Sequence, residues 1–399
     1  MESCNTTSSQ HEDPIKAASR RRFLVGGILV LGLIAVALWI TGLGPQLVRQ
    51  ATYVGRPPTF SGDSQKLKQT VIVPTLDSPC PPGKNVIWCS SFQLAWNEVK
   101  DNVIHAPLQV IGAEETAARL NAAKQSTSDL DPKSFYVAGG WIKDGIVGKI
   151  KKDMAAKFRS HVLPDFNDYD VGILAYSYLT ARVPFKHPFR QADEGLTFTD
   201  SQGIQTRVAG FGLWRAYLRR YKNIREQVEV LYVRWKDANR PEEMAEYALD
   251  LCRHSEPYQA VVARVEPKGS LAEMLEHVRT QIADFEKQPR RAVDSRCGAN
   301  DELRVPELFW RIDHRFKELT DKTVTNASPP MPIVEALQTI EFRLDRCGAV
   351  LESDSMLAVT ASPRYFEFNR PFLVYMQKRG VEQPFFVMWV DNAELLVRR

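Results

Sequence analysis

Runs of apolar residues at different spacings along the chain predict both strands and helices. Residues 170–183 (DVGILAYSYLTARV) are rich in β-forming residues and are apolar at odd and even positions alike. A strand with two apolar faces is buried on both sides, so this run predicts a central strand of a sheet, closed by Pro184. Residues 227–235 alternate between apolar and polar positions, which predicts another strand.

The other predicted elements fall before and after this central strand. Residues 85–98 begin as an extended run and continue as an amphipathic helix, and a second helix is expected at 114–124. Ser270 is expected to be the N-cap of a helix that ends near Phe285. Further strands are expected at 259–265, 340–344, 365–368, 372–377 and 384–390. Strands that lie mostly late in the chain, without a regular βαβ series, predict an α+β fold of mixed sheets with helices.

Residues 23–43 form an apolar segment of 21 residues without a charge. A helix of this length is about 30 Å long, which matches the hydrocarbon core of a bilayer. Arg20, Arg21 and Arg22 come directly before it, and the next basic residue is Arg49. By the positive-inside rule, this single-pass segment has a cytoplasmic N-terminus and an extracytoplasmic (periplasmic or extracellular) main domain.

The three arginines also resemble the twin-arginine export signal, although the positive-inside rule alone explains them equally well. No A-x-A cleavage site follows the apolar segment, which favours an uncleaved signal anchor. We therefore expect a cytoplasmic tail at 1–22, a transmembrane signal anchor at 23–43, a flexible spacer at 44–79 and a folded domain at 80–399.

The composition excludes several classes of protein. Hydrophobic residues at 44% and charged residues at 25% are ordinary globular values, which excludes a disordered or collagen-like chain. A net charge of +4 is small for a chain that binds nucleic acid. The chain has no Gly-x-Ser-x-Gly elbow, no complete phosphate-binding loop, and no zinc-type spacing of Cys or His. We therefore expect no enzyme, no metal and no cofactor.

Five cysteines follow the apolar segment, and an odd number leaves at least one thiol free or paired between molecules. Cys80 and Cys89 enclose a Pro-Pro-Gly turn and are the candidate disulfide. The alternative is that all five are small buried residues.

One basic cluster lies at residues 214–225, which hold three aromatic residues and no acidic one. Such a cluster could hold an anionic polymer or a lipid headgroup. The alternative is a surface strand or helix whose long side chains lie over aromatic rings. Its cations are Arg215, Arg219, Arg220, Lys222 and Arg225.

The C-terminal part of the chain contains three motifs in a characteristic order, at residues 341–349, 368–375 and 383–390. Residues 341–349 (EFRLDRCGA) are similar to the serpin hinge, where a strand ends in an acidic residue and Gly before a long exposed loop. The loop would run from Gly348 to about Arg364. Residues 368–375 are similar to the strand that follows the serpin reactive loop, and residues 383–390 resemble the closing strand.

Upstream segments resemble serpin segments in the family's order. Residues 85–91 are similar to the entry to the second serpin helix, and residues 148–150 are similar to the segment before a central strand. Residues 174–189 resemble that central strand and its end. Residues 228–235 resemble a barrel strand, and residues 269–273 resemble the start of a helix. Between Asn85 and Gly148 the chain is about half as long as serpins are there. Several helices and one strand of the main sheet are therefore expected to be missing or reduced.

Serpin inhibition, as the resemblance implies it, requires the cleaved loop to insert into the sheet as a new strand with alternate side chains buried. After Gly348, an inward set that begins at Ala349 continues with Leu351 and Ser353. Leu351 is bulky for a tight sheet interior. The opposite register would bury two carboxylates, which is more costly. Insertion is thus expected to be compromised.

The resemblance places the candidate reactive-loop bond among Thr360, Ala361 and Ser362, depending on the end from which the loop is counted. Ser362 precedes Pro363, and most serine proteases cleave poorly before proline. Arg364 would attract a trypsin-like enzyme but lies close to the following strand.

These observations predict a membrane-anchored, extracytoplasmic, serpin-like protein with a non-inhibitory binding or structural role. The alternative is a serine-type endopeptidase inhibitor that acts through the loop 349–364. The expected partners are the membrane, through residues 23–43, and a protease or an anionic surface polymer.

Overall fold

A computed structural model describes residues 56–158, 163–182, 185–214, 222–236, 244–289, 291–346 and 363–399. The chain divides into two units at Pro57 and Pro58, and the described residues belong almost entirely to the second, Pro58–Arg399. The apolar segment 23–43 lies outside the described residues.

The main sheet has seven strands, and its centre is the pair β6 and β17. β6 pairs with β17 in parallel and with β5 in antiparallel orientation, while β15 lies antiparallel on the other side of β17. β1 is a parallel edge strand beside β15. The strands are β1 (Phe60–Asp63), β4 (Val110–Ile111), β5 (Phe135–Trp141), β6 (Ile173–Arg182), β15 (Leu308–Arg315), β16 (Lys322–Val324) and β17 (Met331–Leu344).

A second seven-stranded sheet joins segments from both ends of the domain in the order β11-β12-β13-β19-β20-β3-β2. The strands are β2 (Thr70–Ile72), β3 (Asn85–Cys89), β11 (Glu229–Trp235), β12 (Met244–Asp250), β13 (Tyr258–Arg264), β19 (Phe372–Lys378) and β20 (Pro384–Val390). The last two strands of the chain thus lie in its middle.

A four-stranded sheet has the order β18-β14-β10-β7, and β8 and β9 form a separate hairpin. These strands are β7 (Arg190–Gln191), β8 (Leu196–Thr199), β9 (Gln205–Val208), β10 (Gly210–Leu213), β14 (Glu302–Pro306) and β18 (Tyr365–Glu367).

The helices are α3 (Ser90–Glu98), α4 (Glu114–Ala122), α5 (Ile146–Lys157), α6 (Lys222–Glu226), α7 (Leu271–Glu286) and α8 (Arg291–Asp294). Shorter turns of helix are η1 (Ser64–Lys66), η2 (Val99–Ile104), η3 (Thr127–Asp129) and η4 (Ile142–Asp144). As predicted, the Ser270 hydroxyl caps α7 by accepting a hydrogen bond from the Glu273 amide.

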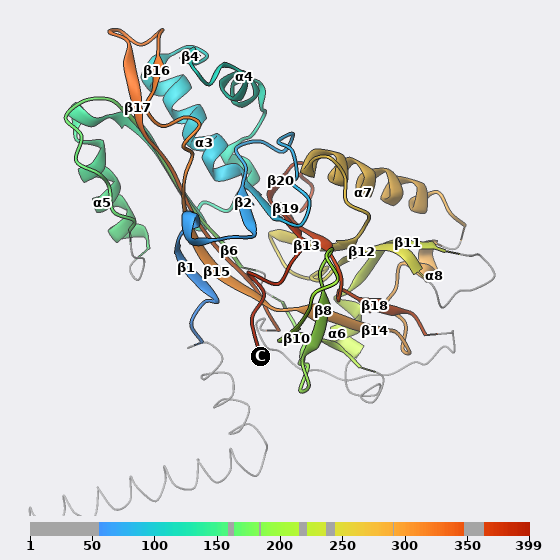
Figure 1. Cartoon of the computed structure of the whole chain (residues 1–399). Coiled ribbons are helices and arrows are strands. Elements are labelled where there is room, and N and C mark those ends of the chain that lie inside the picture. The colour runs from blue at the N-terminus through green and yellow to red at the C-terminus, as the bar shows by residue number, and fades with distance from the viewer. Residues whose placement is uncertain are drawn as a thin grey trace, which may run out of the picture. The chain divides into compact units, whose positions relative to one another are not determined.

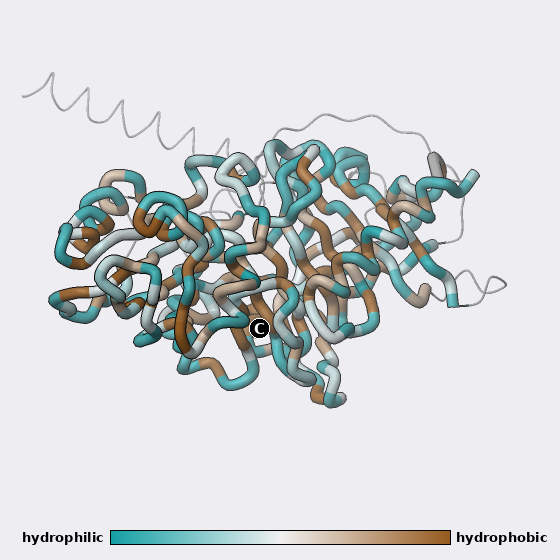
Figure 2. Tube along the Cα trace, turned by 90° about the horizontal axis from the view of Figure 1, so that it is seen from above, coloured by the Kyte–Doolittle hydropathy of each residue, from teal (hydrophilic) through white to brown (hydrophobic). Residues whose placement is uncertain are grey.

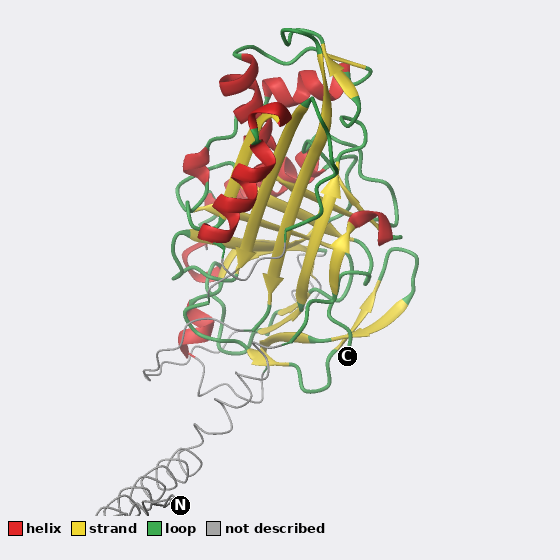
Figure 3. Ribbon diagram, turned by 90° about the vertical axis from the view of Figure 1, so that its left-hand side faces the viewer, coloured by secondary structure: helices red, strands yellow, loops and turns green. Residues whose placement is uncertain are grey.

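Helices cover both faces of the main sheet. Figure 1 shows α5 on one side of the long strands and α3 on the other, and α5 lies in front of them in Figure 3. A hydrophobic core extends from α3 to both large sheets, while separate clusters lie beneath α7 and beneath α5. In Figure 2 the hydrophobic stretches follow the stacked strands. β6 is therefore buried on both faces, as its sequence predicts.

The α+β fold with mixed sheets is confirmed, and several predicted elements lie where expected, including α4, α7, β11 and β20. β17 is much longer than predicted, because it begins at Met331 rather than near Ile340. Pro332, Glu335 and Gln338 interrupt the apolar pattern of this strand. Its polar residues have specific partners on both faces of the sheet, described below.

Residues 58–79 are part of the folded unit and not of a spacer. β1 pairs with β15 from Phe60 to Asp63, and β2 pairs with β3 from Thr70 to Ile72. Both strands are too short to produce a recognisable period, which is why their composition suggested a flexible segment.

Within the described ranges, no helix is both long and apolar enough to cross a membrane. The same ranges contain no group of His, Cys, Asp and Glu side chains that could hold a metal ion.

Candidate functional site

The candidate site is the seam between β6 and β17, together with the two ends of the loop that follows β17. The seam is paired from Ile173 beside Ile333 to Arg182 beside Arg343. Near the loop, an ion pair of 3.2 Å between the Arg182 guanidinium and the Glu341 carboxylate joins the two strands. An added strand could enter only where this pairing opens.

A buried polar cluster lies on the inner face of the seam. Ser177 and Gln338 are direct neighbours in the pairing, and both are fully buried. The Gln338 side-chain amide donates to the Ser91 hydroxyl at 2.9 Å and to the Cys89 carbonyl at 3.1 Å, and the Ser91 hydroxyl donates to the Ser177 hydroxyl at 3.3 Å. These bonds tie both strands to the start of α3.

The polar cluster was missed by the sequence analysis. A single Ser within ILAYSYL and a single Gln within EALQTIEF were its only sequence signals. A buried polar residue needs a hydrogen-bond partner, so each signal implies a partner without identifying it. The partners lie 86 and 247 residues away along the chain, a distance that pattern analysis cannot bridge.

The outer face of the seam is covered by α5. Ile150 and Met154 of this helix pack in one buried cluster with Tyr176 of β6 and Leu337 of β17. The helix is tied to β5 as well, because the Tyr136 hydroxyl donates to Asp153 at 3.0 Å and the Lys157 ammonium donates to the Phe135 carbonyl at 2.6 Å. Both faces of the seam are therefore covered from Ile173 to Leu179 of β6, whereas Arg182, at the end next to the loop, is exposed.

The C-terminal end of the loop is fixed by Arg364. Its guanidinium forms an ion pair with Asp301 at 2.6 Å, and the Arg364 amide donates to the same carboxylate at 3.0 Å. A further bond of 2.8 Å joins the guanidinium to the Asp294 carbonyl. Only 13% of the Arg364 side chain and 4% of the Asp301 side chain are exposed. Arg364 is therefore a structural residue and a poor target for a trypsin-like enzyme.

The N-terminal end of the loop is fixed near Asp345. Arg343 forms an ion pair with Asp345, and its guanidinium lies 4.7 Å from the centre of the Phe309 ring. The Arg346 carbonyl accepts a hydrogen bond from the Phe189 amide at 3.0 Å. Residues 347–362 lie outside the described part of the chain, and with them the predicted hinge and bond residues Gly348, Ala349, Leu351, Ser353, Thr360, Ala361 and Ser362.

The described part of the basic cluster does not present a cationic face. Arg225 is 6% exposed and donates to the carbonyls of Gly298 and Asp301 at 2.7 and 2.9 Å. Lys222 is exposed and lies 3.7 Å from Glu226. Arg225 thus supports the turn that binds Arg364 and is not available to an anion. Arg215, Arg219 and Arg220 lie outside the described residues.

The candidate disulfide is absent, since Cys80 and Cys89 are both free thiols. Alternate residues of β3 face opposite sides of the sheet, and Cys89 belongs to the core that contains α3. Cys80 instead packs against the cluster beneath α7. The Cys89 thiol lies 3.3 Å from the Ser91 hydroxyl, and burial raises the pKa of Cys89 to about 11.

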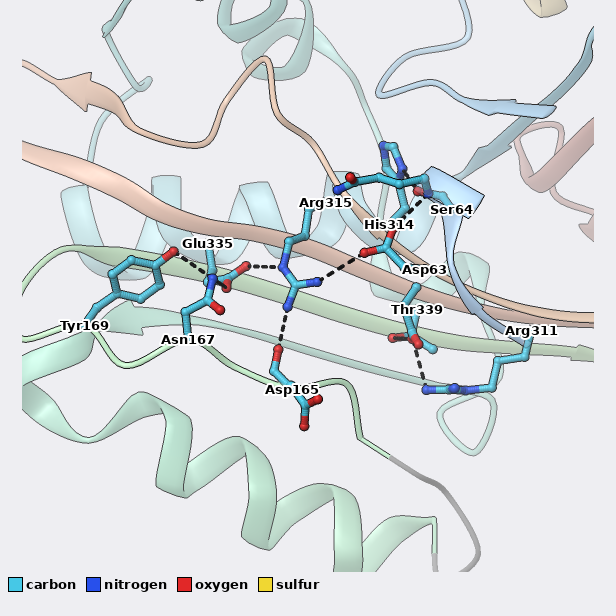
Figure 4. Close-up of polar contacts among 12 residues, drawn as sticks. Asp63, Ser64, Asp165, Asn167, Tyr169, Arg311, His314, Arg315, Glu335 and Thr339 are labelled. Carbon is cyan, nitrogen blue, oxygen red and sulfur yellow. Dashed lines mark hydrogen bonds and ion pairs between the residues drawn. The ribbon is translucent and has the colours of Figure 1, made fainter. Parts of the chain in front are cut away.

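A polar network crosses the outer face of the sheet beside α5 and attaches β1 (Figure 4). Arg315 lies between the carboxylates of Glu335 and Asp63, at 3.2 and 3.8 Å. The Asn167 side-chain amide donates to Glu335 at 3.2 Å. Burial raises the pKa of Glu335, although Arg315 opposes this effect. The network joins β1, β15 and β17 to the segment after α5.

His314 connects β15 to the turn that follows β1. Its Nδ1 atom lies 2.8 Å from the Ser64 hydroxyl, and its Nε2 atom is buried with no hydrogen-bond partner in the described part of the chain. Burial lowers the pKa of His314 to about 4, while the nearby Asp63 carboxylate acts in the opposite direction.

No family model matches the chain, and no curated protein is similar to it in sequence. Solved structures with a similar fold include the following two. Native protease nexin-1 with heparin is 12% identical, covering 77% of this chain and 92% of that chain at a TM-score of 0.47. The thermophilic serpin tengpin in its native state is 14% identical, covering 79% of this chain and 90% of that chain at a TM-score of 0.48. At these identities the likeness concerns the fold alone.

The chain's own elements agree with the serpin resemblance of the sequence. The segment expected to enter a helix leads through β3 into α3, and the segment before the central strand lies in α5, directly before β6. The strands expected after the loop are β19 and β20. The fold is serpin-like and divergent, and the described residues between β5 and β6 form the short turn η4 and one α-helix, α5.

Replacing Asp301 by Asn should expose the loop end to trypsin. The substitution removes the charge that binds the Arg364 guanidinium, so cleavage after Arg364 should become at least about ten times faster than in the wild type, the equivalent of about 1.4 kcal/mol of lost protection. Limited trypsin digestion followed by mass spectrometry would locate the cut. Asp284→Asn is the matched control, because Asp284 is exposed and forms a surface ion pair with Lys287. Equal digestion of both variants would contradict the structural role of Asp301.

His314→Gln should flatten the loss of stability between pH 6.5 and pH 4. In this interval the unfolded chain binds a proton at His314 that the folded chain does not bind, so the wild type becomes less stable as the pH falls, by an amount on the order of 2 kcal/mol. Glutamine cannot bind this proton, while the carboxylates of the network titrate in both proteins. Urea unfolding at several pH values would measure the difference. Parallel pH curves would show that His314 is not buried in its neutral form.

Proposed function

We propose that this protein is a membrane-anchored, serpin-like binding protein whose loop stays outside the main sheet, and that it does not trap proteases. The observation that carries this proposal is the burial of both faces of the seam between β6 and β17 along Ile173–Leu179 of β6. A protease trap needs a strand to enter this seam, and its side chains must fit both sides.

The direction of the strands defines what an inserted loop would meet. A segment that folds back from the end of β17 on its β6 side would run antiparallel to both strands. Its inward side chains would meet the core at Ser177 and Gln338, which are both fully buried. Its outward side chains would meet the layer of Tyr176, Tyr178 and Leu337 beneath α5.

The loop sequence fits neither layer well. In the register that places Ala349 and Leu351 inward, Glu352 and Asp354 point outward, toward the side that α5 covers. In the other register the same two carboxylates point into the core. Burying an unpaired carboxylate costs several kcal/mol, so either register opposes insertion. The loop is therefore better suited to contact a partner from outside the sheet.

Protease inhibition is the second candidate, and the parallel pairing of β6 with β17 favours it. A strand inserted between two parallel strands forms antiparallel pairs on both sides. The loop also has length to spare. Leu344, before the loop, pairs with Leu308, and Tyr365, after it, pairs with Glu302. The six residues from Glu302 to Leu308 span at most about 20 Å, whereas an extended chain from Leu344 to Tyr365 spans about 70 Å.

A cut in the loop should leave the melting temperature within about 2 °C of that of the intact protein, because the cut strand does not insert. The full chain in detergent would be nicked with low doses of several proteases, the cut mapped by mass spectrometry, and unfolding followed by circular dichroism. Protein exposed to inactivated protease is the control.

A clear rise in melting temperature after a cut within residues 349–364 would show insertion and overturn the binding role. A protease adduct that survives denaturing electrophoresis would do the same. The expected result is that the cut and uncut samples melt at the same temperature and that no protease adduct forms.

The membrane anchor should hold the full chain in the membrane pellet after alkaline carbonate extraction, because an apolar helix about 30 Å long spans the bilayer. Deleting residues 23–43 should release the protein to the supernatant. Protease added from the extracytoplasmic side should digest the domain while the N-terminal tail stays protected. Release of the full chain by carbonate would contradict the anchor, and a protected domain would contradict the orientation.

A further inference from the structure

We propose that the open edge of the main sheet at β5 takes up an extended segment of a partner protein as an added strand, and that this segment has an apolar centre with a carboxylate at each end. β5 (Phe135–Trp141) pairs with β6 on one side, and no other described strand pairs with it on the other side. The inference rests on the proposed binding role and names the kind of partner that the sheet would bind.

The backbone of β5 faces β6 at alternate residues, as in any antiparallel pair. Just before the strand, the Ser134 carbonyl accepts a hydrogen bond from the Thr180 amide at 2.8 Å. Just after it, the Ile142 amide donates to the Gly172 carbonyl at 3.0 Å. The even-numbered residues of this segment therefore bond to β6, and the backbone groups of the odd-numbered residues point away from it.

Most of these outward backbone groups have no partner. The Lys157 ammonium donates to the Phe135 carbonyl at 2.6 Å. Within the described part of the chain, no hydrogen bond reaches the outward amides and carbonyls of Val137, Gly139 and Trp141. These three residues present three donors and three acceptors in a row, which are the groups that an added strand would pair with.

β5 lacks the features by which edge strands usually avoid new pairing, namely a charged side chain, a proline or a bulge. Its sequence, FYVAGGW, has no charge and no proline, and its pairing with β6 is regular throughout. Gly139 is half-buried and has no side chain, so the exposed part of this residue is its backbone. A Cβ atom at this position would lie 2.5 Å from Val99 Cγ2, so the close packing of the neighbouring helix requires glycine here.

Apolar side chains border the edge on the face that α3 covers. Val137 and Trp141 of β5 and Val103 and Ile104 of η2 pack against the core but stay only half-buried. η2 lies against β5, so these side chains belong to one region. Alternate side chains of an added strand would point toward this region and extend the core, which favours an apolar centre for the incoming segment.

A lysine lies at each end of the edge. The Lys157 ammonium is 5.3 Å from the centre of the Phe135 ring, and the Lys143 ammonium is 5.8 Å from the centre of the Trp141 ring. Across the described ranges, no ion pair joins either lysine to a carboxylate. The two rings are six residues apart, about 20 Å along a strand, so carboxylates at both ends of an incoming segment would meet the two ammonium groups.

The same lysines disfavour a second copy of this chain as the added strand. The antiparallel register that pairs all seven residues of β5 with those of another copy places Phe135 opposite Trp141. Lys157 of one copy would then approach Lys143 of the other, and like charges repel at such a contact. A partner with carboxylates in these positions replaces this repulsion by attraction.

The test is titration of the full chain, reconstituted in phosphatidylcholine nanodiscs, with a fluorescent peptide of the sequence Glu-Thr-Val-Thr-Val-Thr-Val-Thr-Glu. The fluorescence anisotropy should show saturable binding. Hydrogen exchange of the Val137, Gly139 and Trp141 amides should slow in the complex, while the amides that already bond to β6 should not change. The same peptide N-methylated at alternate residues cannot complete the ladder of hydrogen bonds and should bind at least tenfold more weakly.

Val137→Pro should weaken binding of the peptide at least tenfold. The substitution removes one outward donor and no bond to β6, and proline is tolerated at such positions of an edge strand. Val137→Ala is the matched control, because it also removes the valine side chain but keeps the amide, and it should change the affinity less than threefold. The double variant Lys143→Gln, Lys157→Gln should bind more weakly than the wild type and with a shallower salt dependence.

Three outcomes would overturn the proposal: no saturable binding by the wild type, equal binding of the N-methylated peptide, or an equal loss of affinity in Val137→Pro and Val137→Ala. The N-methylated peptide decides the question even where Val137→Pro does not fold. Self-association of the wild type in detergent that the peptide does not displace, measured by analytical ultracentrifugation, would assign the edge to a second copy and also overturn the proposal. A melting temperature that rises after the loop is cut would overturn the proposed function without affecting binding of the peptide.

Discussion

The parallel pairing of β6 with β17 is the constraint on which the rest of the structure depends. Both strands lie in the middle of a sheet whose two faces are covered along most of their length, so the side chains buried there must have an apolar neighbour or a specific polar partner. The bonds from Ser177 and Gln338 to the start of α3 meet this need on one face. On the other face, α5 meets it by packing against Tyr176 and Leu337.

The loop after β17 is attached at both ends, and the contacts that fix the two ends are different. At one end, β17 runs directly into the Arg343–Asp345 pair. At the other, Arg364 and Arg225 converge on the turn around Asp301. Two cations on one buried turn create a firm attachment, because an ion pair with little exposure and several hydrogen bonds resists opening more than a surface pair does. The turn around Asp301 thus fixes the point at which the chain leaves the loop and enters β18.

The sequence predicted those parts of the fold in which one local pattern determines the element. β6 has apolar residues on both faces, and α7 begins after Ser270, an N-cap residue that is evident from the sequence. The segments that resemble serpin segments fall in β3, α5, β6, β11, α7, β17, β19 and β20, in the expected order along the chain. The central burial of β6 and the late strands β19 and β20 followed from the same patterns.

The features that the sequence did not predict depend on residues far apart in the chain. Gln338 interrupts an apolar strand, and the reason is its hydrogen bond to the Ser91 hydroxyl. Arg225 lies in a segment that suggests a surface cation, but its guanidinium binds backbone carbonyls. Cys80 and Cys89 are close in sequence but belong to clusters on different sides of a strand. Short edge strands such as β1 have no period to detect, and only their pairing partners define them.

The edge strand β1 has a mechanical consequence. It runs parallel to β15 over four residue pairs, and the preceding part of the chain enters at its first residue. A pull on the N-terminus directed along the strand would load these pairs together in shear, with the contacts of Asp63 and Ser64 to β15 at the far end sharing the force. Such a ladder has to slip as a unit and cannot be peeled apart one bond at a time.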